Sequence, residues 1–166
     1  HSTYEGKALA AKFIQDREYA KESLLLCECN WPNTVLAHTE DHVGDPSLES
    51  QILSAVTGRE IDEAGLYRIG ERIWNVQRAI MVREGHRGRE SDTISEYHHT
   101  VGLDVPRLNV RSDNVRWLAP GKDGAIVNRQ GAVVERDKFE AMKDEYYALR
   151  KWDVASGLQT RACLED

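Results

Sequence analysis

Residues 62–85 read DEAGLYRIGERIWNVQRAIMVREG and carry the strongest helical signal in the chain. Asp62 is well suited to cap the start of a helix, and Gly85 favours the left-handed turn at which many helices stop. Between them, apolar side chains recur at intervals of three and four residues, as along one face of an α-helix: Leu66, Ile69, Ile73, Val76 and Ile80. The stretch therefore predicts one long helix with one apolar face.

A second helix is predicted near the start of the chain, from about Tyr4 to Cys27. Its apolar stripe follows the same spacing: Leu9, Phe13, Ala20 and Leu24. The polar residues between these positions should face solvent: Lys7, Lys12, Gln15, Asp16 and Glu18. The run Leu24-Leu25-Leu26-Cys27 is apolar on every side, so we expect it to be buried. Trp31-Pro32 ends any helix, because the proline ring disfavours helical geometry at the residue before it.

Two more helices are predicted further along the chain. Asp45-Pro46 is a helix-start signal, and Gly58 should end that short helix. Its apolar face is expected to consist of Leu48, Ile52, Leu53 and Val56. Asp137 should cap a last full helix that runs to Arg150, with these side chains pointing inward: Phe139, Met142, Tyr146 and Leu149. A turn at residues 152–157 and a helix start at Thr160 should follow.

Residues 86–131 have no helical periodicity and are rich in glycine, proline and charged residues. We therefore expect a long irregular loop, and such loops are often functional or pack on other parts of a protein. Residues 125–127 and 132–134 could pair as a small β-hairpin across the turn between them. The predicted fold class is mainly α, with this irregular loop and a small hairpin.

Composition narrows the class of protein. Of the 166 residues, 40% are hydrophobic and 30% are charged, as in ordinary globular proteins. The formal net charge of −6 lacks the basic footprint of a nucleic-acid binder. No apolar run is long enough for a membrane span. We expect a cytoplasmic protein. Because the chain begins at His1 and stops soon after the helix start at Thr160, we interpret it as a piece of a longer polypeptide.

The three cysteines offer the first candidate chemistry. An odd number argues against a secreted disulfide framework, so reduced thiols or thiolate metal ligands fit better. Cys27-Glu28-Cys29 could bind a metal or an iron–sulfur cluster, or the cysteines could pack as small hydrophobic residues. His38 and His42 have the four-residue spacing of a helical zinc pair, although surface histidines are the simpler interpretation.

Two further groups have simple interpretations beside functional ones. His98-His99 could act as a general acid or base in the irregular loop, but most such histidines only lie at the surface. Tyr146, Tyr147 and Trp152 have a helical arrangement that favours packing anchors over a cofactor-binding set. From the residues alone, function does not follow.

Three stretches then form an ordered pattern. The first runs from Phe13-Ile14-Gln15-Asp16 to Glu22-Ser23-Leu24-Leu25-Leu26-Cys27, the second is the long helix at 66–82 followed by Arg83-Glu84-Gly85, and the third is residues 144–153, DEYYALRKWD. In this order and spacing they resemble the C-terminal region of the aldehyde:ferredoxin oxidoreductase family. The resemblance covers most of the chain. It implies a helical C-terminal domain of a larger enzyme that contains a tungsten (or molybdenum) bis-pterin and a [4Fe–4S] cluster.

The resemblance also assigns residues. It implies that Cys27 is the fourth thiolate ligand of the cluster, and that the other three ligands lie outside this chain. Glu22 matches an acidic residue that bonds a pterin, and the main chain at Leu26 matches the segment beside that pterin. Catalytic residues are expected upstream of His1. Residues 1–44 would then contact the cofactors, and the helical part at about 45–166 would serve as scaffold and substrate-channel wall.

Two positions depart from the pattern of the family. Aldehyde oxidases of the family have Asp where this chain has Glu22, and Gly where it has Leu25. We expect Leu25 to obstruct the close backbone approach that glycine permits. The implied substrate is therefore an aldehyde, or a related carbonyl or aromatic coenzyme A thioester such as those that ring-reducing members of the family use.

The implied function is electron transfer between such a substrate and a ferredoxin or similar electron carrier. The implied partners are this carrier, the rest of the same polypeptide and other subunits. Two alternatives remain open. The chain could be a helical scaffold without cofactors, or an unrelated helical module with zinc bound by Cys27, Cys29, His38 and His42.

Overall fold

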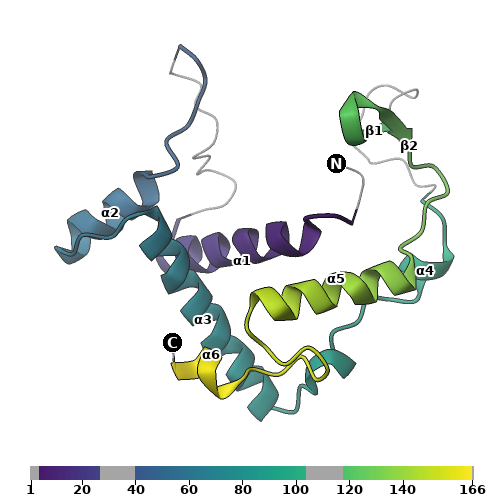
Figure 1. The fold of residues 1–166 in the computed structure, drawn as a ribbon. Coiled ribbons are helices and arrows are strands. Elements are labelled where there is room, and N and C mark those ends of the chain that lie inside the picture. Colours follow the sequence, from purple (N-terminus) through teal and green to yellow (C-terminus); the bar gives the residue numbers. More distant parts are fainter. Residues whose placement is uncertain (1–3, 27–39, 104–117, 166) are drawn as a thin grey trace. The chain divides into compact units, whose positions relative to one another are not determined.

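The computed structural model describes residues 4–26, 40–103 and 118–165. In these ranges the chain forms six α-helices and one two-stranded antiparallel hairpin, so the mainly α prediction is confirmed (Figure 1). It packs as two compact units, one of residues 10–86 with 164–166 and the other of residues 1–9 with 87–163. The predicted division near residue 44 separates residues by expected cofactor contact and stays a prediction.

Helix α3, Glu63–Arg83, is the long helix of the first unit, and both of its predicted ends are confirmed. The Asp62 side chain accepts a hydrogen bond of 2.7 Å from the Gly65 N–H, so it caps the helix. After the helix, Gly85 has a φ of 106°, and the His86 N–H reaches back 2.9 Å to the Met81 carbonyl. This closing hydrogen bond belongs to a turn that only a residue with positive φ completes.

The apolar stripe of α3 is only partly buried. Leu66 is 2% exposed, whereas Val76 and Ile80 are 61% and 43% exposed. The buried residues of the helix are Leu66, Gly70, Asn75 and Arg78. The packing face is therefore rotated away from the stripe and includes Gly70, at which the main chain of α1 comes close.

Helix α1, Lys7–Ser23, is shorter than the predicted 4–27. The prediction that residues 24–26 are buried is wrong, because Leu25 is 93% exposed. The helix stops at a turn in which Leu25 has a φ of 59°, and this turn carries the Leu25 side chain outward. Cys27 lies outside the described residues.

The buried and exposed faces of α1 also differ from the prediction. Asp16 is 2% exposed, although we expected it to face solvent, whereas Phe13 of the apolar stripe is 52% exposed. The burial of Asp16 is tolerated because its Oδ2 lies 2.8 Å from the Lys12 Nζ. The same Nζ lies 2.9 Å from Oε1 of Glu71 on α3. A buried carboxylate needs such a partner.

Helices α1 and α3 meet closely at one point. A Cβ atom built on Gly70 would lie 1.8 Å from the main-chain oxygen of Asp16, so only glycine fits there. Aromatic pairs lie on both sides of this crossing. Tyr19 stacks on Trp74 with ring centroids 5.1 Å apart, and Phe13 meets Tyr67 edge to face at 5.6 Å. The crossing positions the C-terminal half of α1 within its unit.

Helix α2, Leu48–Thr57, begins later than Asp45-Pro46 predicted. The Asp45 carboxylate instead accepts hydrogen bonds from the N–H and hydroxyl of Ser47, at 2.9 and 2.6 Å. These bonds form a turn before the helix and lower the pKa of Asp45. Gly58 ends the helix with a φ of 68°, as predicted. Val56 is 81% exposed, so the predicted apolar face is incomplete.

The second unit contains the predicted irregular stretch, whose described residues include three short helical turns: Gly88–Glu90, α4 at Tyr97–Thr100, and Lys122–Gly124. Its hairpin pairs β1, Leu118–Pro120, with β2, Ile126–Asn128. The predicted pairing of 125–127 with 132–134 is wrong in its second strand. Residues 131–134 make their hydrogen bonds elsewhere, because the Ala132 carbonyl accepts from the Leu103 N–H at 2.9 Å.

Helix α5, Arg136–Leu149, starts one residue before the Asp137 that we expected as its cap. Leu149 is 39% exposed, so it is not an inward residue. The aromatic packing anchors are confirmed. Tyr147 and Trp152 are 2% and 4% exposed and stack at 6.0 Å. Helix α6, Arg161–Glu165, follows Thr160 as predicted, and the Thr160 hydroxyl accepts from the Cys163 N–H at 3.2 Å.

Arg89 ties the irregular stretch to α5. Its guanidinium forms ion pairs with Asp144 and, at 2.6 Å, with Glu140. It also donates 3.0 Å to the main-chain oxygen of Val154 and lies over the Tyr147 ring. Planar guanidinium groups suit such combined contacts. Arg89 therefore holds three segments of this unit together.

The Arg89 cluster predicts a pH dependence. Burial acts to raise the pKa of Glu140, but hydrogen bonds from Lys143 and Arg89 lower it by more, so the net pKa lies below its ordinary value. A lowered pKa in the folded state means that this carboxylate stabilises the fold above its unfolded pKa, and the contribution disappears as pH falls through the folded one. Thermal unfolding across this acid range should show a smaller pH dependence for Glu140→Gln than for the wild type. Glu145→Gln, at an exposed position of the same helix, should match the wild type, and an equal change in both variants would contradict the prediction.

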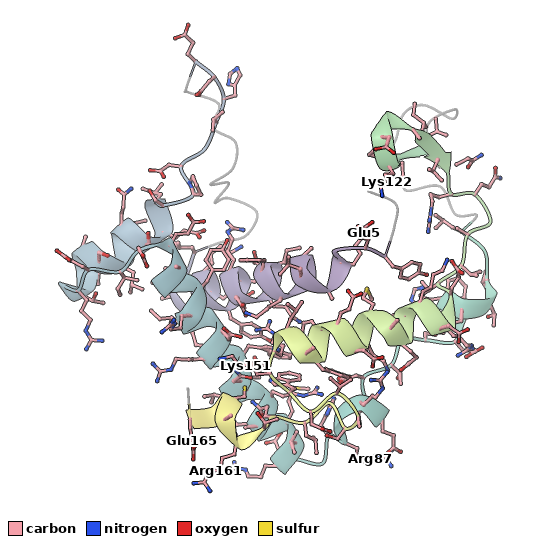
Figure 2. All side chains as sticks on the ribbon, in the orientation of Figure 1. Glu5, Arg87, Lys122, Lys151, Arg161 and Glu165 are labelled. Atoms are coloured by element: carbon pink, nitrogen blue, oxygen red, sulfur yellow. The ribbon has the colours of Figure 1, made fainter. Side chains whose placement is uncertain are left out.

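Both polar and large apolar side chains are exposed on the described part of the chain. Exposed charged side chains include Arg87, Lys122 and Lys151 (Figure 2). None of the helices in the described ranges is both long and apolar enough to cross a membrane.

Candidate functional site

The C-terminal end of α1 is the part of the predicted cofactor site that the structure describes. The main-chain hydrogen bonds that close the helix include those from the Leu24 N–H to Ala20 at 3.1 Å, from the Leu25 N–H to Glu22 at 2.9 Å, and from the Leu26 N–H to Lys21 at 3.2 Å. The bond across five residues and the left-handed residue before its donor form a Schellman-type cap. The turn is therefore built by the main chain.

Leu25 occupies the left-handed position of this cap, with a φ of 59°. Glycine is the usual residue there because any Cβ atom meets the neighbouring carbonyl, at a cost of about 1–2 kcal/mol. The backbone thus has the conformation that glycine would adopt. The expected obstruction is limited to the side chain, which is 93% exposed.

Glu22 lies in the last turn of α1, with its side chain exposed. Within the described part of the chain, its carboxylate has no hydrogen-bond or ion-pair partner. The neighbouring Lys21 is fully buried and pairs instead with Glu18 at 2.6 Å. Glu22 is therefore available as a hydrogen-bond acceptor beside Leu26, whose side chain is half-buried.

Of the four residues in the alternative zinc site, the structure describes only His42. Cys27, Cys29 and His38 lie outside the described residues. His42 is described and exposed, with a φ of 56°. Among residues 4–26, 40–103 and 118–165, no group of three or more histidine, cysteine or acidic side chains could hold a metal ion.

Of the two adjacent histidines in the irregular stretch, His99 makes a hydrogen bond that connects two segments. His98 is exposed, and its ring meets Tyr97 edge to face at 5.6 Å. The His99 Nδ1 lies 2.6 Å from the Val134 main-chain oxygen, so this nitrogen carries the proton and donates it. His99 thereby joins α4 to the segment before α5.

A cleft of about 630 Å³ lies between α1 and the first turns of α3. Its lining is mostly charged or aromatic: Lys12, Phe13, Asp16, Asp62, Glu63, Ala64, Tyr67, Arg68 and Glu71. Burial, followed by the charge of Glu63, raises the pKa of Tyr67. The phenol therefore keeps its proton at neutral pH.

The decisive comparison is with a protein-family model. The model for aldehyde ferredoxin oxidoreductase, domains 2 and 3, matches residues 1–166. The chain belongs to the aldehyde ferredoxin oxidoreductase family. Enzymes of this family are oxidoreductases and typically bind a tungsten–pterin and an iron–sulfur centre. No solved structure matches the chain significantly.

The third stretch that carries the family resemblance contacts the loop that follows the second stretch, within the second unit. The Tyr147 hydroxyl donates 2.7 Å to Asp92, the acidic residue in the charged loop after the long helix. Lys143 Nζ also donates 3.1 Å to the Asp92 main-chain oxygen. No sequence pattern assigned a role to Arg89 or Asp92. Their signal was the abundance of charged residues in the irregular stretch after Gly85.

Proposed function

We propose that this chain is part of a tungsten–pterin, iron–sulfur oxidoreductase that oxidises aldehydes or reduces a related carbonyl or aromatic coenzyme A substrate. Membership of the aldehyde ferredoxin oxidoreductase family supports the class of reaction. The specific substrate, the choice of tungsten over molybdenum and the electron carrier are parts of the proposal. Electrons would pass to a ferredoxin-like carrier in the cytoplasm, where thiols stay reduced.

The backbone at Leu25 is the observation that carries the assignment of the site. The family has glycine at this position, and the chain has the left-handed backbone that glycine favours, with a φ of 59°. Leucine itself rarely adopts a positive φ. The agreement supports the alignment of residues 22–27 with the pterin- and cluster-contacting segment of the family.

The residues at the end of α1 fit the chemistry of the two groups. Glu22 offers an exposed carboxylate without a partner among the described residues, and pterin rings carry N–H donors that such an acceptor can bind. The main chain at Leu26 would lie beside the pterin. Cys27 would supply a thiolate to the cluster, since iron–sulfur clusters are held by cysteine thiolates.

The proposed reaction balances as a two-electron oxidation. An aldehyde and one water give a carboxylic acid, two protons and two electrons, and the carrier accepts the electrons singly. The bound cofactors supply the redox chemistry, whereas the protein binds, orients and sets potentials. In this chain, Glu22 and the Leu26 main chain would orient the pterin, and the sequence proximity of Cys27 would keep the cluster close to it.

The first test is metal analysis and an optical spectrum of the complete enzyme, purified without oxygen, beside its Cys27→Ser variant. The wild type should contain tungsten or molybdenum and about four irons per cluster. Cys27→Ser should lose most of the iron and the broad absorbance of the cluster. Cys163→Ser should retain both the iron and the absorbance of the cluster, because Cys163 lies in α6 and has no proposed ligand role.

The alternatives give different results in the same experiment. Absence of tungsten, molybdenum and iron from the wild-type enzyme would refute the proposal and leave the scaffold interpretation. Stoichiometric zinc alone, lost on substitution of His38 or His42, would support the zinc module. Iron that is unchanged in Cys27→Ser would refute the ligand assignment while leaving the family membership intact.

A further inference from the structure

The cleft between α1 and the first turns of α3 has no part in the proposed function. The residues that line both of its walls belong to the unit of residues 10–86. Its volume of about 630 Å³ lies within the usual range of small-ligand sites, about 300–1,000 Å³. Glu22 and Leu26 are not among the residues that line it. The cleft is therefore a candidate for a second binding site, separate from the predicted cofactor site.

One wall of the cleft presents an exposed aromatic ring. Phe13 is 52% exposed, although its ring meets Tyr67 edge to face with centroids 5.6 Å apart. An edge-to-face contact covers only one face of one of the two rings, so other ring faces are left for a ligand. The face of an aromatic ring carries the negative part of its quadrupole and attracts cations. This wall therefore favours a ligand that is flat and positively charged.

The charged groups of the cleft have an excess of negative charge. The described lining carries four carboxylates and two basic side chains: Asp16, Asp62, Glu63, Glu71, Lys12 and Arg68. Lys12 lies 2.8 Å from Asp16 and 2.9 Å from Glu71, so one ammonium group serves two carboxylates. The Glu63 carboxylate is exposed and has no hydrogen-bond or ion-pair partner within the described ranges. Glu63 is therefore available to pair with a cation.

Tyr67 responds to the negative field in the cleft. Burial is the largest cause of the raised pKa of its phenol, and the charge of Glu63 is the next. Asp16 and Glu49 act in the same direction, whereas Arg17 acts against them. Negative charges disfavour the phenolate because it is an anion, and the same charges favour a cation at this place. The field at Tyr67 thus agrees with the charge of the lining.

We propose that this cleft binds a guanidinium group, from a small guanidino compound or from the arginine side chain of another polypeptide. A guanidinium ion is planar, so it can stack on an aromatic ring, and its five N–H donors can reach more than one carboxylate. Glu63 accepts hydrogen bonds from the ligand, and the Phe13 ring stacks on it. The exposed Arg68 side chain has the same charge as the ligand and therefore weakens its binding.

Isothermal titration calorimetry of the complete enzyme at constant ionic strength tests the proposal. N-acetyl-arginine amide should bind with a dissociation constant on the order of 1 mM. Its neutral isostere, N-acetyl-citrulline amide, should bind about tenfold more weakly or less. Glu63→Gln should weaken the arginine probe about tenfold, whereas Arg68→Gln should strengthen it. Glu60→Gln removes the same charge at an exposed position outside the cleft, so it should leave the affinity unchanged.

Three results would overturn the proposal. Equal affinity for the arginine and citrulline probes would mean that charge is not recognised. Equal weakening by Glu63→Gln and Glu60→Gln would mean that the cation binds outside the cleft. Absence of binding of the arginine probe to the wild type at about 10 mM would remove the site altogether.

Methylguanidine in the same titration distinguishes the two sources of the guanidinium group. Affinity equal to that of the arginine probe would support a small guanidino compound. Binding of the arginine probe that is about tenfold tighter would support an arginine side chain, because contacts beyond the guanidinium would then contribute. These readouts do not depend on metal content, so they can fail while the proposed function holds.

Discussion

Gly70→Ala should lower the free energy of unfolding by about 2 kcal/mol or more, although alanine is the better helix former. The new Cβ atom would lie 1.8 Å from the main-chain oxygen of Asp16 and 2.7 Å from its carbonyl carbon. Main-chain atoms in a helix cannot rotate away, so α1 and α3 must separate and lose their aromatic contacts. Overpacking of this kind costs about 3 kcal/mol, and the gain in helix propensity returns about 1 kcal/mol.

Gly65→Ala is the matched control in the same helix. Its Cβ atom would meet the Asp62 side chain at 3.1 Å and Ile61 at 3.3 Å, and both are side-chain contacts that can adjust. Urea unfolding followed by circular dichroism should therefore show a change within about 1 kcal/mol for Gly65→Ala. Equal stabilities of the two variants would show that the helices do not cross as closely as the structure indicates.

Trp152→Ala should destabilise the protein by about 3–5 kcal/mol, in the range of large-to-small changes at buried aromatic residues. Trp152 is 4% exposed, stacks on Tyr147 and meets Tyr146 edge to face at 5.9 Å. Its removal would leave a cavity between α5 and the turn that follows. The loss of packing should also loosen Tyr147, whose hydroxyl binds Asp92.

The same unfolding experiment with Trp152→Phe and Val154→Ala gives the necessary comparison. Trp152→Phe keeps an aromatic ring and should lose less than half as much stability. Val154→Ala removes a side chain that is 38% exposed in the same turn, so its effect should be below about 1 kcal/mol. A loss for Val154→Ala as large as that for Trp152→Ala would mean that the turn, and not the aromatic stack, is responsible.

The sequence predicted elements well where local signals agree. In α3, an Asp62 cap, a regular apolar period and Gly85 all indicate the same boundaries, and the structure has them. Thr160 likewise marks the start of α6. Tyr147 and Trp152 were expected to be packing anchors because of their helical spacing, and both are buried.

Other features depend on contacts that no local pattern contains. Asp16 is buried because Lys12 neutralises it, and Lys12 also pairs with Glu71, which is 55 positions from Asp16 in the sequence. The partner of β2 is β1, whose sequence Leu118-Ala119-Pro120 shows no alternation of polar and apolar residues. The end of α1 was placed too late because the apolar run through Leu26 conceals a turn made by main-chain bonds.

For the candidate site, the residues alone suggested possible metal ligands at Cys27 and Cys29, and at His38 and His42, whereas the family resemblance supplied Glu22 and Leu26. The structure adds the conformation of the turn that carries these residues. For Leu25, which we expected to obstruct a close approach to the backbone, it adds an exposed side chain on a backbone with the positive φ that glycine favours. No periodicity or composition could have indicated a positive φ at a leucine.

The discontinuous composition of the second unit has a consequence for synthesis on the ribosome. Residues 10–86 form contiguous local contacts and can begin to fold while the rest is still being translated. Tyr4, in contrast, accepts a hydrogen bond of 2.9 Å from the Glu135 N–H, 131 positions later. At ordinary elongation rates this partner emerges on the order of 10 s after Tyr4. Tyr4 must therefore wait in the nascent chain without this partner while the unit that follows it begins to fold.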